Sequence, residues 1–345
     1  MQPPSSYTEA IVQPSVTDQS PYDASIIVVS FNTRELLREC LESIIRESAN
    51  LSVEILVVDN DSWDGSAQMV EDEFPNIRLL RSKINLGFGS ANNLALTHAR
   101  GRYYVLLNSD AFFQSHALEL AIRHMDQAPE CGLAGGRLIG RDGSWQPSAR
   151  SFHTIIHDLI VKTGLAAKFP KSRFFGHFDR TWADPHQPAM VDWVPGAFSI
   201  IRAAAVDKIG LFDPAFFLYY EEVDLCRRIK QAGYTIWYWP DIVVVHVGGE
   251  SSRQLTTLEV SARSSQVELW RMRSTLLYYR KYHGTQALMA KWLEIVMYRI
   301  TVVRNRFSRT PLRRERAQRH RTLIELMKQA WKDTDGGRVS PPRPW

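Results

Sequence analysis

The chain has 345 residues, of which 44% are hydrophobic and 23% are charged, and its formal net charge is +5. These values are typical of a globular protein with one large core or two smaller ones. The three cysteines, Cys40, Cys131 and Cys226, form no CxxC pair, which argues against a disulfide framework or a zinc site and fits a reducing compartment. We also expect no signal peptide and no transmembrane helix, because no segment combines the required length and apolar character.

The first 250 residues alternate between expected strands and helices. Residues 1–22 are rich in Pro, Ser, Gln and Thr and are predicted to be disordered. Four strands are expected in the first part, at 25–31, 53–59, 77–81 and 103–108. A helix is expected after each of the first three. This alternation predicts an α/β domain with a mostly parallel central sheet flanked by helices. Further strands are expected at 131–140, 191–201, 233–240 and 242–249, around a variable insertion that would face a substrate.

The composition changes after residue 250. Helices are predicted at 257–282 and 285–304, and the second is apolar apart from a few charges. Nine arginines lie between Arg299 and Arg321. An apolar helix beside such a basic segment is typical of proteins that lie on an anionic membrane surface. A solvated basic helix that packs on the rest of the chain or on a second subunit would give the same pattern. We therefore divide the chain into 1–22, 23–250 and a helical extension, 251–345.

Polar residues follow two of the predicted strands. Asp59 ends the second strand and Asn60 begins the loop after it, and the fourth strand ends in Asn108, Ser109 and Asp110. Open α/β sheets bind ligands at the carboxyl ends of their strands, where an acid can hydrogen-bond a ribose or a base edge. Oxygen donors of this kind also suit Mg²⁺ or Mn²⁺ held against a diphosphate. Ordinary turns and helix caps use the same residue types, so both interpretations stay open.

A cluster of acids follows four aromatic residues in the segment FFLYYEEVD, residues 216–224. Glu221, Glu222 and Asp224 stand at the start of a predicted helix, beneath apolar side chains. Carboxylates in such surroundings can have raised pKa values and act as general bases, although acids also suit any helix N-terminus. His246 lies in an apolar alternation just before two glycines. It is either a core histidine or a ligand for Mn²⁺.

Several motifs, in this order, resemble family 2 glycosyltransferases across about residues 24–250. They are VVSFNT (28–33), VVDNDSWDGS (57–66), NLGFGSANN (85–93), LLNSD (106–110), PGAF (195–198), FDPAFFLYYEEVDLCRR (212–228) and the group His246, Val247, Gly248, Gly249 and Ser251. QPSAR (146–150) and LYYRKYHG (277–284) are similar to the bacterial rhamnosyltransferase-like branch. The chain has neither a GxGxxG after its first strand nor a P-loop, which argues against a nicotinamide or flavin enzyme and excludes a P-loop enzyme.

The resemblance implies a GT-A fold and a role for each matching residue. A nucleotide sugar would be bound by Ser30, Asn32, Asp59, Asn60, Asn85, Gly87, Asn92 and Asn108. Asp110 and His246 would meet the metal, although many relatives carry an acid where this chain has Asn108. Glu222 would be the base, with Glu221 beside it and Asp224 as the alternative base. The sugar and acceptor pocket would include Trp145, Trp193, Gly196, Phe217, Tyr219 and Trp237, although Trp193, Phe217, Tyr219 and Trp237 would fit the core equally well.

The expected activity is inverting transfer of a sugar from a dTDP- or UDP-sugar, with rhamnose as the leading candidate. The acceptor would be a glycan or a polyprenyl-diphosphate-linked glycan, at the cytoplasmic face of the cell membrane, and no nucleic acid is expected. One alternative is a catalytically silent protein that binds sugar nucleotides or acts as a membrane scaffold. A sugar-phosphate nucleotidyltransferase is a weaker alternative, because VVSFNT lacks the glycine-rich loop of that class.

Overall fold

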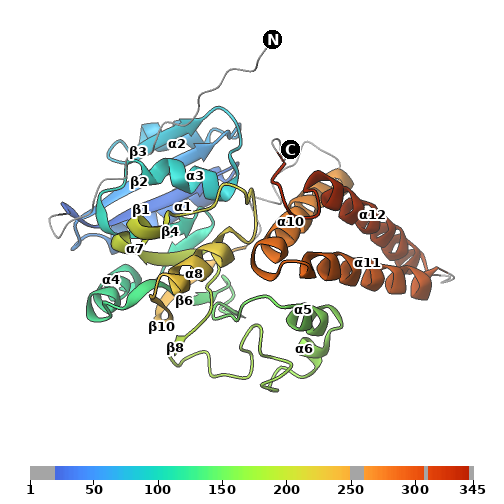
Figure 1. Cartoon of the computed structure of the whole chain (residues 1–345). Helices are drawn as coiled ribbons and strands as arrows, with labels where there is room; N and C mark the ends of the chain where they lie inside the picture. Colours follow the sequence, from blue (N-terminus) through green and yellow to red (C-terminus); the bar gives the residue numbers. More distant parts are fainter. Residues whose placement is uncertain (1–19, 249–259, 307–309, 342–345) are drawn as a thin grey trace, which may run out of the picture.

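The computed structural model describes residues 20–248, 260–306 and 310–341, and it contains an α/β domain and a group of three helices (Figure 1). The predicted disordered tail lies outside the described residues up to position 19, as do Gly249 and Ser251 of the quoted motifs. Tyr22 already belongs to the first strand, where it pairs with Gly101. Order therefore begins slightly earlier than the sequence indicated.

The central sheet contains the strands of the α/β domain in the order β3-β2-β1-β4-β9-β6-β10-β5, with β7 beside β6 and β8 beside β10. The strands are β1 (Tyr22–Ser30), β2 (Val53–Asn60), β3 (Arg78–Ser82), β4 (Gly101–Asn108), β5 (Ala111–Phe113), β6 (Cys131–Ile139), β7 (Trp145–Gln146), β8 (Ala189–Met190), β9 (Phe198–Arg202) and β10 (Thr235–His246). The half that contains β3, β2, β1 and β4 is parallel, as predicted, whereas β9 runs antiparallel to both of its neighbours.

Helices cover both faces of this sheet. They are α1 (Arg34–Glu47), α2 (Ser66–Glu73), α3 (Gly87–Leu96), α4 (Ala117–Gln127), α7 (Ala203–Ile209) and α8 (Glu221–Gln231), whereas α5 (Ile155–Lys162) and α6 (Leu165–Lys168) lie in the insertion, where α5 contacts α11. Ile27 faces one core cluster, while Ile26 and Val28 face the other, and all three are fully buried. Burial on two faces explains the unbroken apolar sequence of β1, because successive side chains of a strand point to opposite faces.

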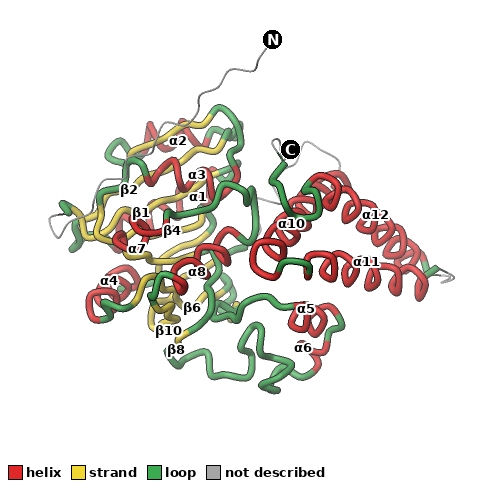
Figure 2. The backbone as a smooth tube through the Cα atoms, in the orientation of Figure 1, coloured by secondary structure: helices red, strands yellow, loops and turns green. Residues whose placement is uncertain are grey.

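Three predicted strands differ in the structure. Of residues 191–201, only those from Phe198 onward form a strand, β9. The segments 233–240 and 242–249 are joined in the single strand β10, which has a register irregularity between Trp239 and Val243. Between β7 and β9 the chain runs mainly as loop, interrupted by α5 and α6 (Figure 2).

The C-terminal group contains α10 (Val260–His283), α11 (Gln286–Asn305) and α12 (Pro311–Asp333), and sequence reasoning missed the last of these. The three helices share a small core that includes Met272, Ile295 and Met327. The far end of α10 instead joins the main core through Tyr278 and Tyr279, which are fully buried. The extension therefore packs firmly on the α/β domain. No helix in the described part of the chain is long and apolar enough to cross a membrane.

Candidate active site

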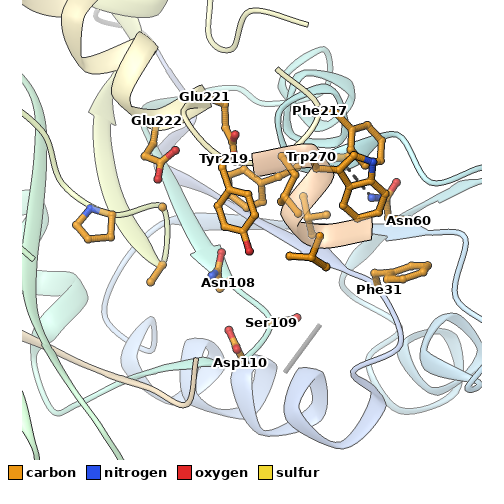
Figure 3. A pocket seen from close by; sticks show the side chains of 18 of the residues that line it. Phe31, Asn60, Asn108, Ser109, Asp110, Phe217, Tyr219, Glu221, Glu222 and Trp270 are labelled. Atoms are coloured by element: carbon orange, nitrogen blue, oxygen red, sulfur yellow. Dashed lines mark hydrogen bonds between the residues drawn. The ribbon is translucent and has the colours of Figure 1, made fainter. Parts of the chain in front are cut away.

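A cavity of about 350 Å³ lies at the carboxyl ends of the central strands, beside α10. Figure 3 shows Glu221 and Glu222 on one side of this cavity, Asn108, Ser109 and Asp110 on a second side, and Phe31 and Asn60 on a third. The predicted site residues that line it are Asn60, Asn85, Gly87, Asn108, Asp110, Gly196, Tyr219, Glu221, Glu222 and His246. The fold thus brings together residues that are far apart in the sequence.

A strained turn directs the two glutamates into the cavity. Tyr219 and Tyr220 both have φ of 70°, a left-handed conformation that bulky residues rarely adopt. The turn is held because Tyr220 packs on Tyr278 of α10, with ring centroids 5.0 Å apart. In addition, Ser274 Oγ donates a hydrogen bond to the Leu218 carbonyl at 2.8 Å. Helix α8 begins immediately after this turn, so its first two side chains face the cavity.

The surroundings of both glutamates favour their protonated forms. Burial raises the pKa of Glu221 well above its usual range, and the adjacent charge of Glu222 adds to this. Burial also raises the pKa of Glu222, while the Arg150 guanidinium acts in the opposite direction. One carboxyl oxygen of each, Oε2, is buried without a hydrogen-bond partner among the described residues. Such a carboxylate can accept a proton from a substrate hydroxyl.

Asp110 and His246 meet on another side of the cavity. Strand β10 pairs with β5 so that His246 lies opposite Ala111, and the Val247 amide donates to the Asp110 carbonyl at 3.0 Å. His246 Nε2 then lies 3.6 Å from Asp110 Oδ1, and both side chains are largely buried. Burial lowers the pKa of His246, although the nearby Asp110 carboxylate opposes this effect. A neutral imidazole beside a carboxylate results.

Gln146 of β7 fixes the orientation of that imidazole. Its Nε2 donates to the His246 carbonyl at 2.8 Å, and its Oε1 lies 2.9 Å from His246 Nδ1. A carbonyl oxygen can only accept, so the amide oxygen must face the ring, and Nδ1 must carry the proton. The lone pair of Nε2 therefore faces Asp110. Sequence reasoning missed Gln146, although it lies in the QPSAR motif.

The donors fit a divalent cation of the Mg²⁺ or Mn²⁺ type. Asp110 offers a buried carboxylate, and His246 offers an imidazole nitrogen with its lone pair directed toward the same point. Over the described residues, no group of three or more His, Cys, Asp or Glu side chains could hold a metal. The described residues of the protein would therefore supply two ligands, and a diphosphate or water would have to supply the others.

A loop between β3 and α3 borders the cavity, and two asparagines hold it there. Asn60 accepts a hydrogen bond from the Leu86 amide at 2.8 Å and donates to Asn85 Oδ1 at 3.0 Å. Gly87 has φ of +77°, and a Cβ at this position would lie 2.2 Å from the Phe217 carbonyl oxygen. Only glycine permits this close approach. Asn60, Asn85 and Gly87 therefore shape the cavity wall in addition to facing the cavity.

Four predicted nucleotide-binding residues do not line the cavity. Ser30 Oγ contacts Thr33 at 3.1 Å, and Asn32 accepts from the Trp63 amide at 2.9 Å. Asp59 accepts from the Ser62 amide at 3.3 Å, and burial raises its pKa. The side chain of Asn92 donates to Phe88 within α3 at 2.9 Å. These buried side chains hold the loops behind the cavity wall.

Three other predicted residues also lie away from the cavity. Asp224 is fully buried and bound to Arg228, Lys281 and Tyr282, so the prediction of an alternative base is wrong. Trp193 is a core residue whose Nε1 donates to the Ser151 carbonyl at 2.8 Å. Trp145 is partly exposed in β7, next to Gln146.

Of the other two aromatic residues predicted for the pocket, one lines the cavity and one does not. Phe217 lines the cavity as expected, and its ring lies 4.7 Å from that of Trp270, whereas Trp237 does not line it. Phe31 and Trp270 line the cavity without having been predicted. No motif pointed to Trp270, because it belongs to α10, which was predicted as part of the C-terminal extension.

Residues 25–185 match the family model described as glycosyl transferase family 2. The chain carries a family 2 glycosyltransferase domain. It is 26% identical over 232 residues to the N-acetylglucosaminyl-diphospho-decaprenol L-rhamnosyltransferase of Mycobacterium tuberculosis, covering 64% of this chain and 75% of that protein. It is 23% identical over 270 residues to rhamnosyltransferase WbbL of Escherichia coli K12, covering 73% of this chain and 91% of that protein.

Two solved structures share the fold of this glycosyltransferase. The mannosyltransferase PcManGT from Pyrobaculum calidifontis, in complex with GDP-Man and Mn²⁺, aligns over 91% of this chain and 88% of its own, with 16% identity and a TM-score of 0.54. GalNAc-T7, solved with UDP, GalNAc and Mn²⁺, aligns over 93% of this chain and 59% of its own, with 13% identity and a TM-score of 0.54. The predicted family, its rhamnosyltransferase-like branch and the GT-A fold are confirmed.

Replacing Gln146 by leucine is expected to weaken Mn²⁺-dependent nucleotide binding by about 10- to 100-fold, the usual cost of losing a group that orients a ligand. Leucine retains the size of the side chain but cannot accept the Nδ1 proton, so His246 is free to turn or change tautomer. Titration calorimetry with dTDP and Mn²⁺ measures the change. Gln187→Leu, on an exposed position, is the control. Equal affinity in Gln146→Leu and the wild type would show that this hydrogen bond does not matter.

Proposed function

We propose that this glycosyltransferase transfers rhamnose, with inversion, from dTDP-rhamnose to a hydroxyl of a polyprenyl-diphosphate-linked sugar in cell-surface polysaccharide synthesis. Two relatives are named as rhamnosyltransferases, which supports rhamnose as the transferred sugar. The name of the Mycobacterium tuberculosis relative also includes N-acetylglucosaminyl-diphospho-decaprenol, which supports a polyprenyl-diphosphate-linked acceptor. The observation that carries the proposal is that Glu222 and the Asp110–His246 pair face one cavity. A base and a site for the leaving diphosphate are what this displacement requires.

The cavity divides into regions of different chemistry. We assign the nucleoside to the side with Phe31 and Asn60, supported from behind by Ser30, Asn32 and Asp59. The diphosphate belongs between the Gly87 loop and Asp110, with Asn108 beside it and Asn92 holding the helix behind. The sugar belongs next to Tyr219 and Gly196, and Trp145 is the candidate contact for the acceptor.

Asp110 and His246 would hold Mg²⁺ or Mn²⁺, which when bound would offset the negative charge of the departing diphosphate. Two structural neighbours contain Mn²⁺ by their titles. At such low identity, these neighbours show only the fold. The proposal that this chain binds a metal is therefore based on its own residues. The neutral imidazole held by Gln146 and the buried carboxylate of Asp110 support it.

The proposed reaction uses Glu222 on one side of the cavity and the diphosphate site at Asp110 and His246 on another. Glu222 removes the proton from the acceptor hydroxyl as that oxygen forms a bond to the anomeric carbon. The bond from the anomeric carbon to the diphosphate oxygen breaks, and its electron pair leaves with dTDP. Because base and leaving group lie on different sides of the sugar, the configuration at the anomeric carbon inverts. Glu221 shares the buried site, and the adjacent charge of Glu222 helps to raise the pKa of Glu221.

The division of the chain is part of this proposal. Residues 23–250 form the catalytic domain, and the residues from 251 onward form an extension that adds Val267 and Trp270 to the cavity. A lipid-linked acceptor would place the enzyme at the cytoplasmic face of the membrane.

Titration calorimetry with dTDP, UDP and GDP, with and without Mn²⁺, tests the donor. We expect dTDP to bind most tightly, and only with the metal. Release of dTDP from dTDP-rhamnose in the presence of an N-acetylglucosaminyl-diphospho-polyprenol then tests the transfer. A preference for UDP or GDP would overturn the rhamnose assignment. Absence of binding for all three nucleotides, in protein shown to be folded, would overturn nucleotide-sugar transfer.

A further inference from the structure

Helix α11 exposes a row of large apolar side chains. Its members are Leu288, Met289, Trp292, Val296, Ile300 and Val303, each with at least 45% of its surface exposed. Most of them follow one another at intervals of three or four residues, the spacing that gathers side chains on one side of a helix. We call this surface the α11 face.

The opposite side of α11 is already covered. Ala287, Ala290 and Ile295 are buried there, and Ile295 belongs to the core shared with α10 and α12. The helix is thus apolar on two sides, whereas a surface helix normally turns a polar side to water. A contiguous exposed apolar surface of this kind marks a site of interaction.

The charge beside the α11 face is strongly positive. From Arg299 to Arg321 the sequence has nine arginines and one acid, Glu315. The described arginines of this segment are all exposed, at the end of α11 and along the first half of α12: Arg299, Arg304, Arg306, Arg313, Arg314, Arg316, Arg319 and Arg321. Helix α12 runs back along α11, so the basic first half of α12 lies beside the last turns of α11 (Figure 1).

We infer that the α11 face docks on an anionic lipid surface. Apolar side chains on one side of a helix with arginines beside them match the boundary between acyl chains and phosphate head groups. A second copy of this chain fits less well, because a symmetric dimer through the α11 face would bring two arginine-rich flanks together. The inference deepens the proposed function, whose acceptor is held in a membrane.

The packing of α10 links this surface to the catalytic cavity. Val267 and Trp270 of α10 line the cavity, while Leu269 and Met272 of the same helix pack in the core shared with α11. Lys162 of α5 also forms an ion pair with the buried Glu294 of α11, with 2.7 Å between Nζ and Oε1. A membrane bound at the α11 face therefore holds the catalytic cavity at a fixed position near the lipid.

Co-sedimentation of the full chain with vesicles tests the inference. We expect the protein to bind vesicles of phosphatidylcholine and phosphatidylglycerol, and to bind phosphatidylcholine alone about tenfold more weakly. The variant Trp292→Ser, Val296→Ser, Ile300→Ser should lose about tenfold in binding to the anionic vesicles. Phe174→Ser and Val339→Ser, which remove exposed apolar side chains elsewhere, are the controls. The variant Arg313→Gln, Arg316→Gln, Arg319→Gln should bind the anionic vesicles more weakly, and its binding should decrease less than that of the wild type as the salt concentration rises.

Failure of the wild type to bind anionic vesicles would overturn the inference, as would undiminished binding of the triple serine variant. A wild-type dimer that the serine variant converts to a monomer, without vesicle binding, would assign the face to a second copy instead. Calorimetric binding of dTDP is measured on every variant. Intact nucleotide binding with no vesicle binding rejects only the docking surface, whereas vesicle binding without nucleotide binding rejects the proposed function.

Discussion

Replacing Glu222 by glutamine is expected to reduce turnover by about 10²- to 10⁴-fold, the usual contribution of a positioned general base. Glutamine keeps the size of the side chain but cannot take a proton from the acceptor hydroxyl. Binding of dTDP should stay within about threefold of the wild type, because Glu222 lies across the cavity from Asp110 (Figure 3). Release of dTDP from dTDP-rhamnose measures turnover, and calorimetry measures binding.

The same substitution has a predictable effect on stability. Burial raises the pKa of Glu222 above its usual value, so the folded protein binds this proton more tightly than the unfolded chain does. Stability is therefore lost as the pH rises from the unfolded pKa, about 4.3, through the raised folded pKa. Glu222→Gln removes this cost, so its melting temperature should equal or exceed that of the wild type at pH 8, with the difference shrinking toward pH 4.

The pH dependence of turnover and a matched variant complete this test. Wild-type turnover should rise with pH through the raised pKa of Glu222, since only the carboxylate can act as the base. Glu221→Gln is the control, because it removes a neighbouring buried acid from the same cavity. Unchanged turnover in Glu222→Gln would refute the assignment of the base. A larger loss in Glu221→Gln would transfer the role to Glu221.

The edge of the sheet where the site lies could be predicted from the sequence. Asn60 and Asn108 each end a strand of the parallel half, so their strands had to bring them to the same edge. Asp110 lies only two residues after Asn108, so it had to lie near the same edge. These residues line the cavity because local sequence and strand order together determine their position.

Contacts over long distances in the chain could not be predicted in this way. Gln146 meets His246 across 100 residues through a two-residue strand, β7, whose sequence has too little pattern to reveal it. Trp270 reaches the cavity only because α10 packs on the turn before α8. Both depend on tertiary packing that no local periodicity encodes.

Asp224 was an alternative to Glu222 as the base, and helical geometry limits that choice to one of the two residues, whereas the packing of α8 decides which one. At roughly 100° per residue, positions 222 and 224 differ by roughly 200° around α8. Two acids so placed face nearly opposite directions, so they cannot both serve one cavity. Glu222 faces the cavity, whereas Asp224 faces α10, where it contacts Lys281 and Tyr282 in addition to Arg228 of its own helix.

Asp224→Ala is expected to cost about 3–5 kcal/mol of the free energy of unfolding, as when one partner of a buried ion pair is removed. The side chain is fully buried and joins two helices. Its Oδ2 lies 2.7 Å from Arg228 Nε within α8, and its Oδ1 lies 2.5 Å from Lys281 Nζ and 2.6 Å from the Tyr282 hydroxyl of α10. Without the carboxylate, the largely buried Arg228 and the partly exposed Lys281 keep their charge and lose this partner, and α10 loses one of its polar contacts with α8.

Urea denaturation of the wild type and the variant measures this cost, and Asp213→Ala is the matched control. Asp213 also binds Lys281, at 2.7 Å, but its side chain is 29% exposed, so its ion pair should contribute only about 0–1 kcal/mol. A loss of stability below about 1 kcal/mol in Asp224→Ala would contradict this structural role. Because α10 supplies Val267 and Trp270 to the cavity, Asp224→Ala should also weaken dTDP binding, whereas Glu222→Gln should not. This contrast separates a residue that holds the site together from one that acts on the substrate.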